Sequence, residues 1–424
     1  MRRYVIDYFR TGVAMTNPFF FIILLALILD YAIGLAADVL NLRALRSELP
    51  PELEGVYEPE RYRRSQEYIR TNTRFDFVTG AFGLAVLLAF WFAGGFNYLD
   101  QLVRSWGFVP IVNGLFYIGI LMAGHSLLML PFSIYDTFVI EERFGFNKTT
   151  RRTFVLDMIK NLGLTALIGG ALLSGVLALF QYAGYQAWVF CWMGFVVFSL
   201  VLQYVAPTWI MPLFNKFTPL QPGELREAIL NYARSVDFPV KNVFVMDGSR
   251  RSTKSNAFFT GFGRNKRIAL FDTLIARHTV PELVGVLAHE IGHHKKKHIL
   301  QGTVISILHA GLLLFLLSIF LGSPGLYDAF HMEQPSIYSG ILFFGLLYTP
   351  LEMVLSVAMH VLSRKNEYEA DRFAAETTHH PKELTEALKK LHTDSLSNLT
   401  PHPFYVFLNY SHPPLLERVR AIRG

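Results

Sequence analysis

Residues 18–37 read PFFFIILLALILDYAIGLAA, a run with a single charged side chain, Asp30. A helix needs roughly 20 mostly apolar residues to cross the hydrocarbon core of a bilayer. Further runs of this kind cover residues 77–96, 108–133, 157–181, 187–213, 299–322 and 337–362. The sequence therefore predicts a mainly α-helical integral membrane protein with about seven transmembrane helices.

The composition supports a membrane protein. Only 17% of the 424 residues are charged and the mean hydropathy is +0.33, whereas soluble proteins usually carry about 25% charged residues. Cys191 is the only cysteine, which excludes disulfides and cysteine-ligated zinc as structural devices. We attribute the net charge of +6 to membrane-facing segments. The expected partner is thus the lipid bilayer and not a nucleic acid.

The distribution of basic residues predicts an orientation. Loop 43–76 holds seven arginines, and segments 134–156 and 214–298 are also basic, whereas 182–186 and 323–336 have no Lys or Arg. The positive-inside rule places the basic loops in the cytoplasm. The N-terminus is then outside and the C-terminus inside. Arg2, Arg3 and Arg10 argue against this, but the alternation across seven spans outweighs them.

A short motif, His289-Glu290-Ile291-Gly292-His293, predicts a metal site. Histidines at i and i+4 of a helix lie on one face and can share one Zn²⁺, and the intervening glutamate can take a proton from a water. The helix is predicted to open at Thr279-Val280-Pro281-Glu282, a capping box with proline in the first turn.

The third ligand must come from elsewhere, and the best candidate is Glu367. Asp371 follows at i+4 and could accept a hydrogen bond from a ligand imidazole. Segment 214–298 also predicts an amphipathic helix over 224–236 and strands over 240–246 and 267–271. We therefore expect residues 1–213 to form transmembrane helices 1–5. A small α+β zincin-like domain would be split between 214–298 and 363–424, around helices 6–7 at 299–362.

Several segments resemble the CAAX prenyl protease 1 family of integral-membrane zinc metalloendopeptidases. They are the motif, residues 363–371 (SRKNEYEAD), 411–418 (SHPPLLER), 141–147 (EERFGFN) and 255–262 (SNAFFTGF). The resemblance implies one Zn²⁺ per chain and seven helices that enclose a chamber. It implies the following roles: zinc ligands His289, His293 and Glu367; catalytic base and acid Glu290; oxyanion stabilisers His412 and Arg418; and a peptide-binding groove at Asn256, Ala257, Phe258 and Gly261.

The predicted function is hydrolysis of peptide bonds near the membrane, in C-terminal CAAX-type prenylated peptides or related membrane-associated substrates. An extended substrate could add to the edge of strand 267–271. One alternative is an HtpX-like quality-control protease with the same chemistry. Another is a transporter with a regulatory zinc site, which would usually show paired internal repeats, and none is evident. Without an evident retrieval signal, a bacterial inner membrane is favoured over the endoplasmic reticulum.

Other polar residues have simpler interpretations. His294, His298 and Glu369 are expected at the surface, and Lys295–Lys297 form a lipid-facing charge patch. We expect His125, His309 and His360 to form contacts between helices, and Glu352 to satisfy backbone groups freed by Pro350.

Overall fold

The computed structural model describes residues 16–46, 55, 57–238, 240, 242–260 and 267–423. Within these residues, seven helical segments are long and apolar enough to cross a membrane, which confirms all seven predicted spans. They are α2 (Pro18–Ala44), α3 (Pro59–Phe92), Pro110–Arg143, Arg151–Tyr182, Gly184–Phe214, α14 (His298–Phe320) and α16 (Ile337–Thr378). The third comprises α5 (Pro110–Tyr135), η2 (Asp136–Ile140) and α6 (Glu141–Arg143); the fourth α7 (Arg151–Leu164), η3 (Thr165–Gly169) and α8 (Gly170–Tyr182); the fifth η4 (Gly184–Gln186), α9 (Ala187–Val205), η5 (Ala206–Ile210) and α10 (Met211–Phe214).

Several helices extend beyond the predicted spans, and the ends of the second and the last span matter for the arrangement of the site. The second span was expected to reach residue 96, but α3 ends at Phe92, and Gly94 in a left-handed conformation (φ 71°) precedes a separate helix, α4 (Gly95–Ser105). The last span was expected to end at residue 362, but α16 continues to Thr378 through Pro350. Glu367 and Asp371 are therefore on the same continuous helix as the last membrane span.

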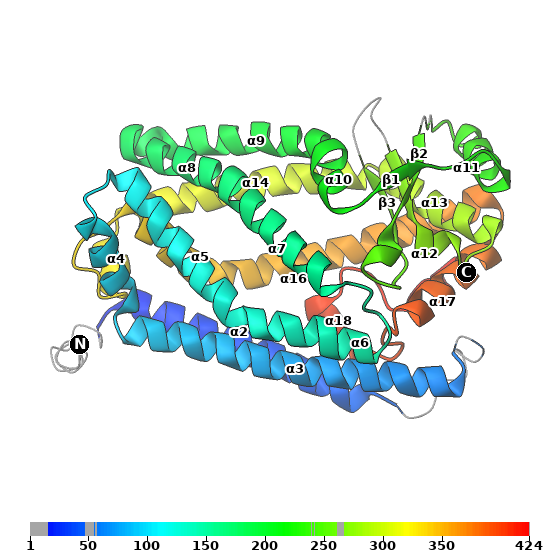
Figure 1. Cartoon of the computed structure of the whole chain (residues 1–424), viewed down its shortest axis with the longest axis horizontal. Helices are drawn as coiled ribbons and strands as arrows, with labels where there is room; N and C mark the ends of the chain where they lie inside the picture. Colours follow the sequence, from blue (N-terminus) through cyan, green and yellow to red (C-terminus); the bar gives the residue numbers. More distant parts are fainter. Residues whose placement is uncertain are drawn as a thin grey trace.

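The spans enclose an open chamber. Only 6–17% of the residues in each hydrophobic window are buried, whereas helices packed around a solid core would bury one full face. In Figure 1, α2 and α3 lie on one side, α9 and α14 on the other, and α5 and α7 cross between them.

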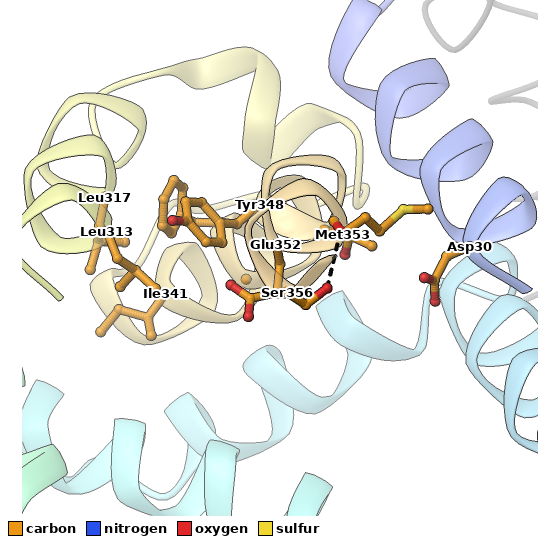
Figure 2. A pocket seen from close by; sticks show the side chains of 11 residues that line it. Asp30, Leu313, Leu317, Ile341, Tyr348, Glu352, Met353 and Ser356 are labelled. Carbon is orange, nitrogen blue, oxygen red and sulfur yellow. Dashed lines mark hydrogen bonds between the residues drawn. The ribbon is translucent and has the colours of Figure 1, made fainter. Parts of the chain in front are cut away.

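Polar side chains line one cavity of this interior. Asp30 from α2 lines it on one side, the apolar Leu313 and Leu317 of α14 line it on the other, and Glu352 and Ser356 of α16 lie between them (Figure 2). Ionisable residues inside membrane spans usually face such a cavity. The positions of Asp30 and Glu352 agree with this rule.

Two of the three intramembrane histidines form the expected contacts between helices. Nε2 of His309 lies 2.9 Å from the Tyr348 hydroxyl, and Nδ1 of His360 lies 2.7 Å from the carbonyl oxygen of Leu408. The interpretation of Glu352 was wrong, because its carboxylate pairs with His309 at 3.3 Å across α14 and α16. His125 is exposed.

A four-stranded sheet lies at one end of the helices, beside the motif helix (Figure 1). Its strands are β1 (Phe217–Pro219), β2 (Asn242–Met246), β3 (Ala257–Thr260) and β4 (Arg267–Phe271), in the order β1-β2-β4-β3. Strands β2 and β4 are parallel; β1 and β3 pair antiparallel to them. The predicted strands are confirmed, but strand 267–271 offers no edge to a substrate. Residues 257–260 form a strand of their own that pairs with β4, so β3 is the edge strand on that side of the sheet.

Helices cover this sheet and share its core. They are α11 (Glu224–Ser235), α12 (Asp272–Ile275), α13 (Val280–Lys295), α17 (Pro381–Asp394) and α19 (Leu415–Arg423). The short helices α15 (Pro324–Asp328) and α18 (Pro403–Asn409) instead contact α2 and α16, and η6 (Gly248–Arg250) follows β2 in the sequence. Ile229, Leu270, Leu287, Leu384 and Leu415 meet in one buried cluster. The predicted capping box opens α13: the Thr279 N–H donates to Glu282 Oε2 at 2.8 Å.

Candidate metal centre and active site

Gly292 lets α13 approach α16 closely. A Cβ atom on Gly292 would lie 3.2 Å from both Cα and the carbonyl oxygen of Ala370 and from the ring of Phe373, which is tighter than nine in ten Cβ contacts. The absence of a side chain at this position brings the inner face of α13, with His289 and His293, against Glu367 on α16.

The three predicted ligands converge. The Nε2 atoms of His289 and His293 lie 3.1 Å apart, and they are 3.4 Å and 3.2 Å from the two carboxylate oxygens of Glu367. Tetrahedral coordination with bonds of about 2.0–2.2 Å places neighbouring donor atoms about 3.3 Å apart. The spacing of the three side chains therefore fits one small divalent cation.

The chemistry of the donors also fits a metal ion. Two imidazoles and one carboxylate are a ligand set of catalytic zinc sites, which keep one position open. Oε2 of Glu367 is buried, and among the described residues it faces Nε2 of His289 at 3.4 Å and the guanidinium of Arg418 at 3.5 Å without a hydrogen bond of regular geometry to either. A buried carboxylate oxygen without a partner is costly unless a cation satisfies it.

Asp371 and Arg418 hold the His289 ring at Nδ1, the nitrogen that does not face Glu367. Nδ1 of His289 lies 2.9 Å from Asp371 Oδ1, and Arg418 donates to both oxygens of Asp371, at 2.6 Å and 2.8 Å. Burial alone would lower the pKa of His289, but hydrogen bonds to Asp371 and Glu367 raise it to about 9. Burial also lowers the pKa of Arg418, but Asp371 outweighs this and raises it above its ordinary value. A carboxylate behind a ligand imidazole fixes its tautomer and orientation.

The prediction that His298 lies at the surface is wrong. It is buried, and its Nδ1 lies 3.1 Å from Nδ1 of His293 while its Nε2 lies 3.2 Å from Glu369 Oε2. His294 is half-buried, edge-on to Phe238. Helix α13 ends at Lys295, and Lys297 takes a left-handed conformation (φ 62°) that turns the chain back. Helical spacing cannot predict a contact made across that turn.

Glu290 faces a cavity beside the ligands. This cavity, about 350 Å³ in volume, is lined by Glu290 and His293 from α13, Ile299 and Gly302 from α14, and Met359 from α16. Burial raises the pKa of the Glu290 carboxyl above its ordinary value, although the two histidines act in the opposite direction. A carboxylate with a raised pKa can both accept and return a proton.

His412 and Arg418 occupy different environments. The His412 side chain is 63% exposed, and its Nε2 lies 3.3 Å from Glu367 Oε1. Arg418 is buried, with its guanidinium bound to both oxygens of Asp371. Of these two side chains, only His412 is free to meet a substrate.

Of the predicted groove residues, Asn256 lies just before β3, and Ala257 and Phe258 lie on this strand, which contacts α13. Asn256 Oδ1 accepts from the Ala257 N–H at 2.8 Å, and the Asn256 carbonyl accepts from the Phe271 N–H. Phe258 pairs with Ala269 in the ladder. Gly261 lies outside the described residues.

Comparison with known proteins agrees with this architecture. Residues 38–216 match the family model described as CAAX prenyl protease N-terminal, five membrane helices, and residues 219–424 match peptidase family M48. The probable CAAX prenyl protease 1 of Schizosaccharomyces pombe is 37% identical over 89% of this chain and 82% of its own length. The CAAX prenyl protease 1 homologue of Arabidopsis thaliana is 36% identical, over 97% and 99%.

A solved structure is also similar. The crystal structure of S. mikatae Ste24p aligns with a TM-score of 0.91 and 33% identity, and the alignment covers 96% of this chain and all of that one. Together with the membrane spans, these matches identify the chain as a multi-pass membrane metalloendopeptidase that belongs to the CAAX prenyl protease family within peptidase family M48.

Proposed function

We propose that this protein is a zinc endopeptidase that cuts membrane-associated peptides, above all C-terminal CAAX-type prenylated peptides. The observation that carries the proposal is the convergence of His289, His293 and Glu367 beside Glu290, next to an open interior formed by membrane helices. Such an arrangement suits a substrate with one part in the bilayer and its scissile bond at the membrane surface.

The roles of the side chains follow from their positions. Nε2 of each histidine and a Glu367 oxygen would hold the ion. When bound, zinc would supply Lewis-acid chemistry, which acidifies a water molecule and polarises the scissile carbonyl. Glu290 would take the proton of the attacking water and return it to the leaving amine.

We assign different roles to the two predicted oxyanion stabilisers. His412 is exposed next to Glu367, so it would donate a hydrogen bond to the carbonyl oxygen as negative charge develops there. Arg418 is buried, donates to both oxygens of Asp371, and lies 3.5 Å from Oε2 of Glu367. We therefore propose that Arg418 is a positioning residue for Asp371 and Glu367.

The edge of β3 would bind the substrate backbone. In an antiparallel pair, successive N–H groups point alternately toward and away from the partner strand. The Phe271 N–H donates to the Asn256 carbonyl, so the backbone groups of Asn256 point toward β4. The N–H of the next residue, Ala257, therefore points away from β4, and it donates to Asn256 Oδ1. An extended peptide can add to such an edge through its main chain, and β3 lies next to α13.

The active site would face the cytoplasm. The start of α3 lies at the same end of the molecule as α13 and α17 (Figure 1), where Arg61 pairs with Asp394. This basic end is the one that the positive-inside rule places in the cytoplasm.

Cleavage of a farnesylated CAAX reporter peptide by purified protein tests the proposal, beside Glu290→Gln and the same peptide without lipid. We expect the wild type to cut the lipidated peptide faster, and Glu290→Gln to bind zinc but not to cut. Equal cleavage of both peptides would show a broader substrate class, as in quality control. A zinc-loaded wild type that cuts neither peptide nor unfolded membrane proteins would refute the proposal.

A further inference from the structure

A second cavity lies beside the catalytic one, at the end of α14 that adjoins α13. Its volume is about 650 Å³, and Lys296, Lys297 and Lys365 line it together with Leu300 and Val304. Glu369 also lines it, held 3.2 Å from His298 and 3.9 Å from Lys365. Among the described residues that line it, three ammonium groups against one carboxylate give the cavity an excess of positive charge.

This cavity opens away from the catalytic one. Gly302 of α14 lines the catalytic cavity, whereas Leu300 and Val304 line the lysine cavity. Residues two apart on a helix are separated by about 200°, so these positions occupy opposite faces of α14. His298 and the hydrogen-bonded amides of Gln301 and Asn366 line both cavities and separate them.

An apolar stripe continues from the lysine cavity along the membrane span. Leu300, Val304 and Leu308 follow at intervals of four residues, and they are 51%, 46% and 62% exposed. Below Lys365 on α16, Val361 and Val354 are also exposed. Positive charge at the membrane surface above an exposed apolar stripe matches the two parts of a phospholipid.

We propose that this cavity binds an anionic phospholipid, with its phosphate among Lys296, Lys297 and Lys365 and an acyl chain along Leu300, Val304 and Leu308. Charge complementarity selects an anionic headgroup, since basic side chains at a membrane surface attract such lipids. The apolar stripe favours a lipid over free phosphate, because an acyl chain would cover the stripe and a phosphate ion would not. This site is separate from peptide hydrolysis and does not rest on the proposed function.

The test is native mass spectrometry of the detergent-solubilised full chain, titrated with phosphatidylserine, phosphatidylcholine or inorganic phosphate. We expect wild type to bind phosphatidylserine more tightly than phosphatidylcholine. The triple variant Lys296→Gln, Lys297→Gln, Lys365→Gln should bind phosphatidylserine roughly tenfold more weakly, with phosphatidylcholine binding unchanged.

A matched control removes the same charge elsewhere. Lys148, Lys216 and Lys382 are exposed and lie outside this cavity, so their triple change to Gln should leave the affinity close to that of wild type. If the pocket variant fails to fold, Lys365→Gln alone serves as the test. Unchanged affinity in the pocket variant, equal loss in the control, or displacement of the lipid by inorganic phosphate would overturn the proposal.

Discussion

Nδ1 of His298 lies 3.1 Å from Nδ1 of His293, on the side of the ring opposite the predicted metal position. Glu369 holds the far nitrogen of His298 at 3.2 Å. His293 is thus supported through His298 and Glu369, as His289 is supported through Asp371 and Arg418. Both predicted imidazole ligands have a partner on their second nitrogen, which fixes the orientation of each ring.

We expect His298→Ala to weaken zinc binding about 10–100-fold, because the loss of such a partner frees the ligand ring to rotate. The dissociation constant is measured by competition with a chelating indicator. His294→Ala is the matched control, since His294 packs edge-on against Phe238. Equal affinity in the His298→Ala protein and wild type would show that His298 only fills space.

The sequence predicted the elements that have strong periodic or local signals. All seven spans, strand β4 and the start of α13 at Thr279 are where they were expected. The convergence of Glu367 on the motif histidines agrees with its prediction as a ligand, although the ligand roles themselves stay a prediction.

Contacts that depend on tertiary packing could not be predicted. His298 lies beyond a left-handed residue, Lys297, so no helical spacing relates it to His293. Strand β3 pairs with β4, and residues 261–266 separate the two strands in the sequence. This pairing makes β4 an inner strand, which the sequence did not predict. The ion pair between Arg418 and Asp371 links α19 to α16, which are far apart in the sequence.

Gly292→Ala should move α13 away from α16. The added methyl group would lie 3.2 Å from the Ala370 backbone, and overpacking of this kind usually costs about 1–3 kcal/mol. We expect lower thermal stability together with weaker zinc binding, because the histidines and Glu367 separate. Gly302→Ala is the control, since no atom of the described residues lies within 4 Å of its added Cβ. An unchanged zinc affinity in Gly292→Ala would mean that α16 shifts with α13.

Asp371→Asn should be strongly destabilising. The side chains of Arg418 and Asp371 are only 6% and 1% exposed, and removal of one partner from a buried pair usually costs about 3–5 kcal/mol. The double variant Asp371→Leu, Arg418→Met removes both charges and should recover much of the stability. It should not recover zinc affinity, since His289 still lacks its acceptor. Thermal unfolding and zinc titration of both variants separate the effect on stability from the effect on zinc affinity. Full recovery of zinc affinity in the double variant would contradict the role of Asp371 in orienting His289.

Glu282 should give a pH-dependent contribution to stability. Burial raises the pKa of Glu282, but Lys390 at 2.7 Å and the Thr279 N–H outweigh this and lower it below its ordinary value of 4.5. A lowered folded-state pKa stabilises the protein above the unfolded pKa, and the contribution is lost as pH falls through the folded value. Glu282→Gln keeps the capping box but loses the ion pair.

We therefore expect Glu282→Gln to unfold at a lower temperature than wild type at neutral pH, by the equivalent of about 1 kcal/mol. The difference should shrink as pH falls below the ordinary value of 4.5, because wild type then loses the same charge. A difference that persists unchanged under acidic conditions would assign the effect to packing instead.

His412→Ala should reduce kcat and leave the zinc affinity unchanged. His412 is exposed at 3.3 Å from Glu367, and loss of one donor to a developing oxyanion usually lowers kcat about 10²–10³-fold. KM should change little, because the bond strengthens only as charge develops on the carbonyl oxygen. Arg418→Lys is the informative comparison: it breaks the two-pronged contact with Asp371, so it should lower stability and zinc affinity along with activity. If His412→Ala loses zinc as Arg418→Lys does, His412 supports Glu367 and does not act on the substrate.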